Sequence, residues 1–113
     1  MISKTDLRIL SLMIEKIERL IEIVEKHTRE EIESDYVYGD AIQYEFEKLY
    51  EDTTRLSAEL RISHPELKID DLRGIRNRVA HEYETVVLSI LIDTIEEDLP
   101  EYKTNLETIV NCN

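Results

Sequence analysis

Hydrophobic residues recur at alternating spacings of three and four along the first part of the chain. The series comprises Leu7, Leu10, Ile14, Ile17, Ile21 and Val24. These spacings return to one side of an α-helix, because each residue advances about 100° around the helix axis. Ser3 precedes the series and Asp6 stands three positions later, an order that resembles a capping box. The pattern predicts a long amphipathic helix that begins near Ser3 and belongs to a helical bundle.

A second series with the same rhythm follows an acidic stretch. Residues 30–40 are rich in Glu and Asp, and we expect a connection between helices there. The positions in helical register after it are Ile42, Phe46, Leu49, Thr53, Leu56 and Leu60. Asp40 followed by Gln43 repeats the capping signature, so we predict a second helix from Asp40 to about Leu60. Residues 61–69 then form the crossing to the next helix.

The third part of the chain combines an amphipathic helix with a more buried one. Residues 70–83 are predicted to form the amphipathic helix, with one of the two leading aspartates as its cap. Its apolar stripe consists of Leu72, Ile75 and Val79. Residues 86–92 are apolar on nearly every side, and no partner strand is predicted elsewhere, so we expect a buried helix that continues to about residue 97. A final amphipathic helix opens at Pro100.

These helices define an all-α fold with one core. The chain has 113 residues, which suffice for one hydrophobic core but not for two. Tryptophan is absent and aromatic residues are few, so the core must consist of Leu, Ile and Val. We predict that residues 1–113 form a single domain, an antiparallel four-helix bundle with a short fifth helical segment.

Composition narrows the possible functions. The formal net charge of −12 argues against general affinity for nucleic acid, so any contact with RNA must be local. Cys112 is the only cysteine, which excludes a disulfide framework and a thiolate metal site. The chain contains neither a run of about 18 apolar residues nor the pattern of a signal peptide. We therefore expect a cytoplasmic protein with no membrane contact.

One short segment gathers positive charge in this acidic chain. Arg73, Arg76 and Arg78 surround His81, and helical geometry places Asn77 and His81 opposite the apolar stripe. Arginine matches the geometry of phosphate oxygens, and histidine exchanges a proton near neutral pH. The cluster thus suits phosphate chemistry, with Arg73 and Arg78 in auxiliary roles. The structural alternative is a solvated helix surface that carries ordinary arginines.

The same segment resembles a known family motif. Residues 76–83 read Arg-Asn-Arg-Val-Ala-His-Glu-Tyr. In the HEPN superfamily an arginine is followed by a polar residue, then by a histidine five positions after the arginine, and in the HepT-like branch by a tyrosine two positions beyond. Residues 60–66 and 93–100 also resemble HepT-like sequences, in the same order and at similar distances.

The resemblance implies a specific function. HepT-like proteins are the toxins of bacterial and archaeal toxin–antitoxin pairs, and HEPN toxins are generally metal-independent RNA endonucleases. The resemblance implies that Arg76 and His81 are the catalytic pair and that Asn77 is an auxiliary polar residue. Tyr83 would be the hydroxyl to which a partner, a minimal nucleotidyltransferase antitoxin, adds AMP. No cofactor or metal ion is expected.

One histidine cannot readily serve both sides of an in-line displacement, which is a physical reason to expect a homodimer with two motif copies in one cleft. Tyr44 and Tyr50 lie off the apolar stripe of their helix and suit a contact with a second copy. Two alternatives remain. One is a non-catalytic helical subunit that binds substrate or regulates a nucleotidyltransferase, and the other is a dimeric scaffold whose arginines pair with neighbouring acids. A binding module should tolerate the loss of His81, whereas a nuclease should not.

Overall fold

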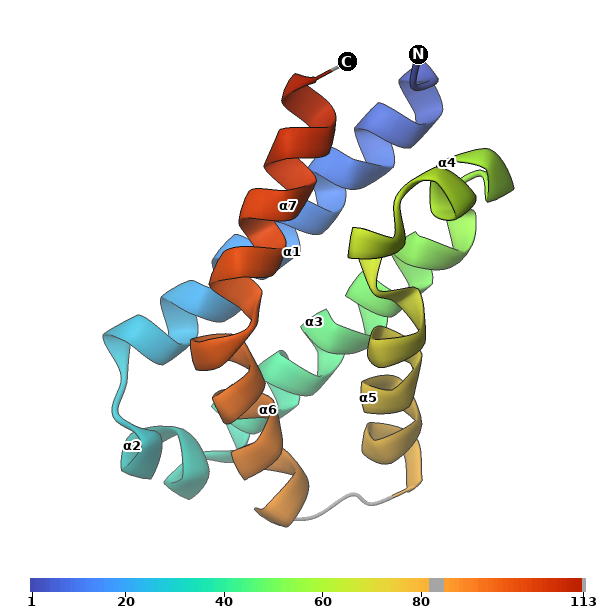
Figure 1. Cartoon of the computed structure of the whole chain (residues 1–113). Helices are drawn as coiled ribbons and strands as arrows, with labels where there is room; N and C mark the ends of the chain where they lie inside the picture. Colours follow the sequence, from blue (N-terminus) through green and yellow to red (C-terminus); the bar gives the residue numbers. More distant parts are fainter. Residues whose placement is uncertain (82–84, 113) are drawn as a thin grey trace.

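Four rods of helix pack in alternating directions in the computed structural model of this chain, which describes residues 1–81 and 85–112 (Figure 1). Side chains are described within these ranges except at positions 80, 81 and 85–87. The rods are α1 (Lys4–Lys26), α3 (Tyr36–Arg55), α5 (Ile69–His81), and α6 (Thr85–Glu97) continued by α7 (Leu99–Asn111). The described residues contain no strand. The predicted all-α antiparallel bundle is confirmed, with α1 packed against α3, α6 and α7.

The start of α1 is capped as expected, but Asp6 has a different partner. The Ser3 side chain accepts a hydrogen bond from the Asp6 backbone N–H at 3.0 Å. The Asp6 carboxylate is 4% exposed and accepts from the backbone N–H and the hydroxyl of Ser57, at 3.0 and 2.6 Å. Asp6 therefore does not close a capping box with Ser3. It joins α1 to the segment that follows α3.

The acidic connection predicted for residues 30–40 is wrong, because this stretch is largely helical. The helix α2 (Arg29–Ser34) begins with a capping box between Thr28 and Glu31. Asp35 then accepts a hydrogen bond from the backbone N–H of Val37 at 3.0 Å, which starts α3 four residues before the predicted start at Asp40. Two of the acidic residues that suggested a loop, Glu31 and Asp35, take part in helix caps. Aspartate is common both at helix caps and in turns.

The predicted single helix from Asp40 to Leu60 is also corrected. The structure ends α3 at Arg55 and starts a short helix, α4 (Ala58–Ser63), with Ser57 as its N-cap. The Ser57 hydroxyl accepts from the backbone N–H of Leu60 at 3.2 Å while it donates to Asp6. A 3₁₀ turn, η1 (Pro65–Leu67), follows, and α5 begins at Ile69, just before the predicted cap.

The core is aliphatic, as expected from the composition. Its fully buried side chains are Leu10, Met13, Ile17, Leu20, Ile32, Ile42, Leu49, Leu67, Leu91, Ile92, Ile95 and Leu106. The hydroxyl of Tyr102 donates to the carbonyl oxygen of Leu67 at 2.6 Å, which attaches η1 to α7, and burial raises the pKa of this phenol. No helix in the described part of the chain is long and apolar enough to cross a membrane.

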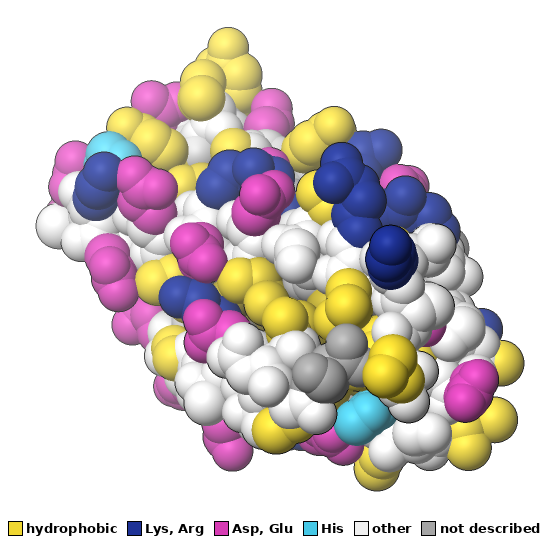
Figure 2. Space-filling model, turned by 90° about the horizontal axis from the view of Figure 1, so that it is seen from above, with side chains coloured by type: hydrophobic (Ala, Val, Ile, Leu, Met, Phe, Trp, Pro, Cys, Tyr) yellow, Lys and Arg dark blue, Asp and Glu magenta, His cyan; other side chains and the backbone are white. Residues whose placement is uncertain are grey.

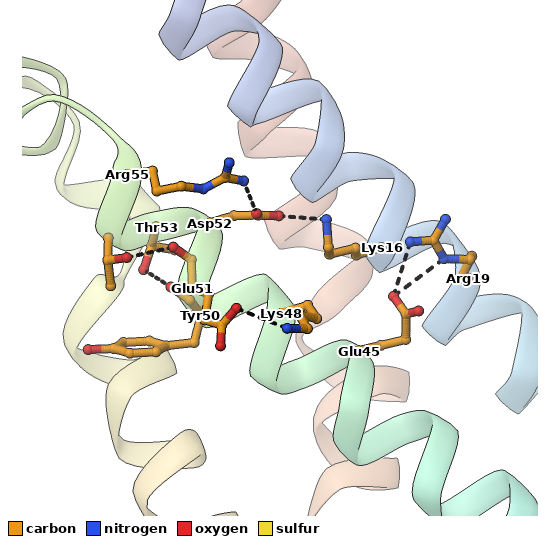
Figure 3. A network of polar contacts seen from close by, with 10 residues as sticks. Lys16, Arg19, Glu45, Lys48, Tyr50, Glu51, Asp52, Thr53 and Arg55 are labelled. Carbon is orange, nitrogen blue, oxygen red and sulfur yellow. Dashed lines mark hydrogen bonds and ion pairs between the residues drawn. The ribbon is translucent and has the colours of Figure 1, made fainter.

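A charged group lies between α1 and α3 (Figure 3). The Asp52 side chain is 5% exposed, and its Oδ2 lies 2.8 Å from Nζ of Lys16. Arg55 pairs with the other carboxylate oxygen. The Lys16 contact is an ion pair and not a well-aligned hydrogen bond. Nearer the middle of α3, Glu45 pairs with Arg19 at 3.3 Å, and the Arg19 side chain is more exposed than that of Lys16.

Candidate active site

The helix α5 carries the clustered arginines, and the apolar stripe predicted for this helix faces the core. Leu72 and Val79 are buried and Ile75 is half-buried, whereas Gly74 and Asn77 are exposed. Asp70 and Asp71 lie in the first turn of α5, where their negative charges interact favourably with the positive end of the helix dipole. Since α5 packs mainly on α3, side chains on its flank meet residues of α3. The predicted division of α5 into a core face and a polar face is confirmed for the described side chains.

Arg76 lies on that flank and is half-buried. The central carbon of its guanidinium is 4.8 Å from the centroid of the Tyr50 ring, within the range of a cation–π contact. Its Nε is buried and has no hydrogen-bond partner. Among the described residues, no carboxylate lies within ion-pair distance of Arg76. Within the described part of the chain, this arginine is therefore in contact with an aromatic face and not with a carboxylate.

Tyr50 connects the two arginines of this cluster. Its hydroxyl accepts a hydrogen bond from Nε of Arg73 at 3.2 Å, while Nη1 of Arg73 lies 2.8 Å from Asp70. The hydrogen bond from Arg73, together with the contribution of Arg76, lowers the pKa of the Tyr50 phenol. Figure 3 shows the Tyr50 side chain directed away from the α1 side of α3 and toward α5. The structure thus brings Arg73, Arg76 and Tyr50 together.

The other predicted site residues are placed less fully. Asn77 and Arg78 are exposed on α5. His81 is the last residue of α5, but its side chain lies outside the described residues, as does the whole of Tyr83. The geometry of His81 and Tyr83 relative to Arg76 stays a prediction.

Tyr50 is the site residue whose role the sequence did not reveal. Its position off the apolar stripe of α3 is the available signal, and this signal predicts a contact with a second copy. That signal indicated a special role but not the partner, because the pairing of α3 with α5 is a tertiary feature. The contacts with Arg73 and Arg76 lie within one chain.

A Cβ atom added to Gly74 would meet no atom within 4 Å. Packing within the protomer therefore does not require a glycine here, although glycine destabilises a helix by about 1 kcal/mol relative to alanine.

The two histidines other than His81 have local partners. The His27 ring contacts that of Tyr38, with centroids 4.3 Å apart, and His64 Nδ1 lies 2.7 Å from Glu66. Among the described residues, no group of His, Cys, Asp and Glu has the arrangement of a metal site.

The sequence is similar to a known family over most of its length. The family model described as "Ribonuclease HepT-like" matches residues 13–109, a span that contains all of α5. A relative from Thermococcus cleftensis, described as "Probable ribonuclease HepT", is 26% identical over 100 residues, which cover 85% of this chain and 91% of the relative. No solved structure gives a significant match. Both descriptions name a ribonuclease.

Proposed function

Since this chain belongs to the Ribonuclease HepT-like family, we propose that it is a metal-independent RNA endonuclease with Arg76 and His81 as its catalytic pair. The observation that carries the proposal is the state of Arg76. Its guanidinium is held against the Tyr50 ring and, among the described residues, pairs with no carboxylate, so its charge is available to a phosphate. An arginine neutralised by a neighbouring acid would suit a purely structural role instead.

The proposed reaction is an intramolecular displacement at phosphorus. The ribose 2′-oxygen bonds to the adjacent phosphorus as the bond to the 5′-oxygen breaks. His81 accepts the proton of the 2′-hydroxyl or donates a proton to the departing 5′-oxygen. Arg76 donates hydrogen bonds to the phosphoryl oxygens, whose charge grows in the transition state. The products are a 2′,3′-cyclic phosphate and a 5′-hydroxyl.

A homodimer supplies both proton-transfer groups in this proposal. One imidazole cannot lie on both sides of the phosphorus, so the second copy contributes the other His81. Two features of the surface support this arrangement. Tyr44 is 59% exposed on α3, and the backbone of α5 at Gly74 is open to close approach. A symmetric dimer that brings two α5 helices together concentrates their arginines in a single cleft.

A toxin must be inactivated by its antitoxin, and modification of Tyr83 is the proposed inactivating step. A minimal nucleotidyltransferase antitoxin would add AMP to its hydroxyl. The added phosphate brings negative charge and bulk close to Arg76 and His81, which blocks RNA. Wild-type protein treated with this partner and ATP should lose activity, whereas Tyr83→Phe should keep it. A Tyr83→Phe protein that is inactivated equally would contradict the switch, and intact mass measures the modification.

The proposed activity is tested with protein produced without a partner. We expect the purified dimer to cleave single-stranded RNA in excess EDTA and to leave 2′,3′-cyclic phosphate ends. A His81→Ala protein purified in the same way controls for contaminating nuclease. Products with 3′-hydroxyl ends would contradict the chemistry. If neither protein cleaves RNA and Tyr83 is unmodified, the nuclease proposal fails and a non-catalytic subunit of a nucleotidyltransferase becomes the better description.

Tyr50 is proposed to position Arg76 for this reaction. Loss of the cation–π contact is worth about 1 kcal/mol, so Tyr50→Ala should lower kcat by about 5- to 10-fold with little change in KM. Tyr50→Phe keeps the ring but loses the hydroxyl that accepts from Arg73, and it should restore most of the rate. Steady-state kinetics on one RNA measures both variants. Equal rates for the Ala and Phe variants would show that the ring does not position Arg76.

A further inference from the structure

A hollow of about 560 Å³ opens where α4, η1 and the first turn of α5 meet. Neither Arg76 nor Tyr50 is part of its lining. Its charged and titratable lining comprises Arg61, His64, Lys68, Asp70, Asp71 and Arg73. Asp70 pairs with Arg73 at 2.8 Å. In a chain with a formal net charge of −12, this concentration of cations is a local exception.

Arg61 and Lys68 are the uncompensated cations of the hollow. Both are exposed, and within residues 1–81 and 85–112 no carboxylate lies within ion-pair distance of either. Elsewhere in the described chain Lys16 and Arg29 pair with carboxylates, whereas Arg8 and Arg76 do not. Figure 2, which looks down on the end of the molecule that carries α4, shows Lys and Arg side chains gathered in one region of a mixed surface. Asp70 and Asp71 also line the hollow, so its three cations against two carboxylates leave a small excess of positive charge for an outside ligand.

The backbone at Lys68 is unusual. Its φ of 47° and ψ of 46° place it in the left-handed region, and no other non-glycine residue in the described chain has a positive φ. A side chain in this region costs about 1 kcal/mol or more, whereas glycine would not be strained. Lysine occupies a position that the backbone alone would give to glycine. Lys68 is the C-cap of η1, a position where the left-handed conformation commonly ends a helix, and its side chain contributes a cation to the hollow.

The hollow shares one residue, Arg73, with the proposed catalytic cluster. Arg73 lines it and also donates to the Tyr50 hydroxyl, and the Tyr50 ring lies under Arg76. Along α5, Arg73 and Arg76 are separated by about 4.5 Å of helix rise. A polyanion bound at Arg76 can therefore extend along Arg73 into the hollow. Ile62, which is 82% exposed, adds an apolar surface to the same lining.

We propose that this hollow is an RNA-binding subsite that holds the substrate strand beyond the cleaved phosphate. Arg61 and Lys68 bind backbone phosphates, and Ile62 contacts the face of a base. This inference rests on the proposed function, because it extends the RNA path from Arg76. The shared residue Arg73 favours RNA over an acidic protein segment, which would have no reason to follow the catalytic helix. The subsite also gives an acidic protein a local means of holding a polyanion.

The test reverses both uncompensated charges in a protein that binds RNA without cleaving it. Arg61→Glu/Lys68→Glu is made in the His81→Ala background, and its affinity for a long single-stranded RNA is measured over a series of salt concentrations. We expect a loss of at least about tenfold in affinity. The plot of log K against log salt has a negative slope, and this slope should become less steep by about 1.4, since each lost single-strand phosphate contact removes about 0.7.

A matched control separates the hollow from general charge. Lys4→Glu/Arg8→Glu makes the same charge change with the same residue types at exposed positions of α1, where neither cation pairs with a described carboxylate. It should leave the affinity and the salt slope nearly unchanged. Equal losses in the two double variants would overturn the proposal. If the reversed charges in the hollow disturb folding, Arg61→Gln/Lys68→Gln gives the same comparison with a smaller expected loss.

Two further outcomes distinguish this inference from the proposed function. If wild-type protein cleaves RNA and the hollow variant binds RNA normally, the subsite is wrong and the nuclease stands. If wild-type protein does not cleave RNA but the hollow variant alone loses RNA affinity, the nuclease is wrong and the subsite stands. Unchanged RNA affinity with a lost affinity for the nucleotidyltransferase would make the hollow a protein-docking site and overturn the proposal.

Discussion

Replacing His81 or Arg76 with alanine is expected to slow single-turnover RNA cleavage by about 100-fold or more while the fold and the oligomeric state stay unchanged. General acid–base catalysis contributes about 10²- to 10⁴-fold, and a donor to the developing phosphoryl charge contributes about 10²- to 10³-fold. Both side chains belong to the proposed catalytic pair on α5. Rapid-quench measurements with enzyme in excess isolate the chemical step from product release.

Two further arginine variants sharpen this prediction. Arg76→Lys should recover only part of the rate, because an ammonium group lacks the planar fork that both stacks on Tyr50 and binds two phosphoryl oxygens. Arg8→Ala removes an exposed arginine from α1 and should cleave at the wild-type rate. Circular dichroism and size-exclusion chromatography control for folding and assembly. An Arg76→Ala protein that keeps half of the wild-type rate would contradict a catalytic role for this residue.

Asp52→Ala is expected to lower the free energy of unfolding by about 3–5 kcal/mol. The substitution leaves Lys16, whose side chain is only 13% exposed, without the carboxylate that lies 2.8 Å away. It also removes the partner of Arg55, which is more exposed and can turn to water. The loss therefore reflects an unpaired, nearly buried ammonium group on α1. Urea denaturation followed by circular dichroism measures the change, with the slope m expected to stay constant.

The matched variants separate the buried pair from exposed ones. Lys16→Met/Asp52→Leu replaces both charges with apolar side chains and should recover most of the lost stability. Glu22→Ala breaks the exposed pair with Lys26 and should cost less than about 1 kcal/mol. A loss below 1 kcal/mol for Asp52→Ala would contradict the assignment of a buried ion pair.

Local sequence signals located most helices because caps and apolar spacing act over a few residues. Ser3, Pro100 and the long apolar stripes placed α1 and α7 correctly. The break after α3 was missed because its cap, Ser57, is held by Asp6, a residue 51 positions earlier. The helix α2 was missed because cap residues and turn residues are of the same types.

One part of the candidate site could likewise be predicted from local sequence, and another part could not. The face of α5 that carries Arg73 and Arg76 followed from helical periodicity alone. The contact of Arg76 with Tyr50 depends on how α5 packs on α3, and no local pattern reports that packing. The left-handed backbone at Lys68 was also hidden, because lysine is not a residue that marks such a position.

The bond between Asp6 and Ser57 makes two distant parts of the chain open together. Ser57, the N-cap of α4, cannot separate from the bundle without breaking two hydrogen bonds to Asp6 in the first turn of α1. Amide hydrogen exchange in α4 should therefore occur through openings that also involve the start of α1, as one cooperative unit. Because α4 forms one wall of the basic hollow, the first turn of α1 controls how often that wall fluctuates. Substitutions at Asp6 would thus alter the dynamics of a surface from which Asp6 itself is absent.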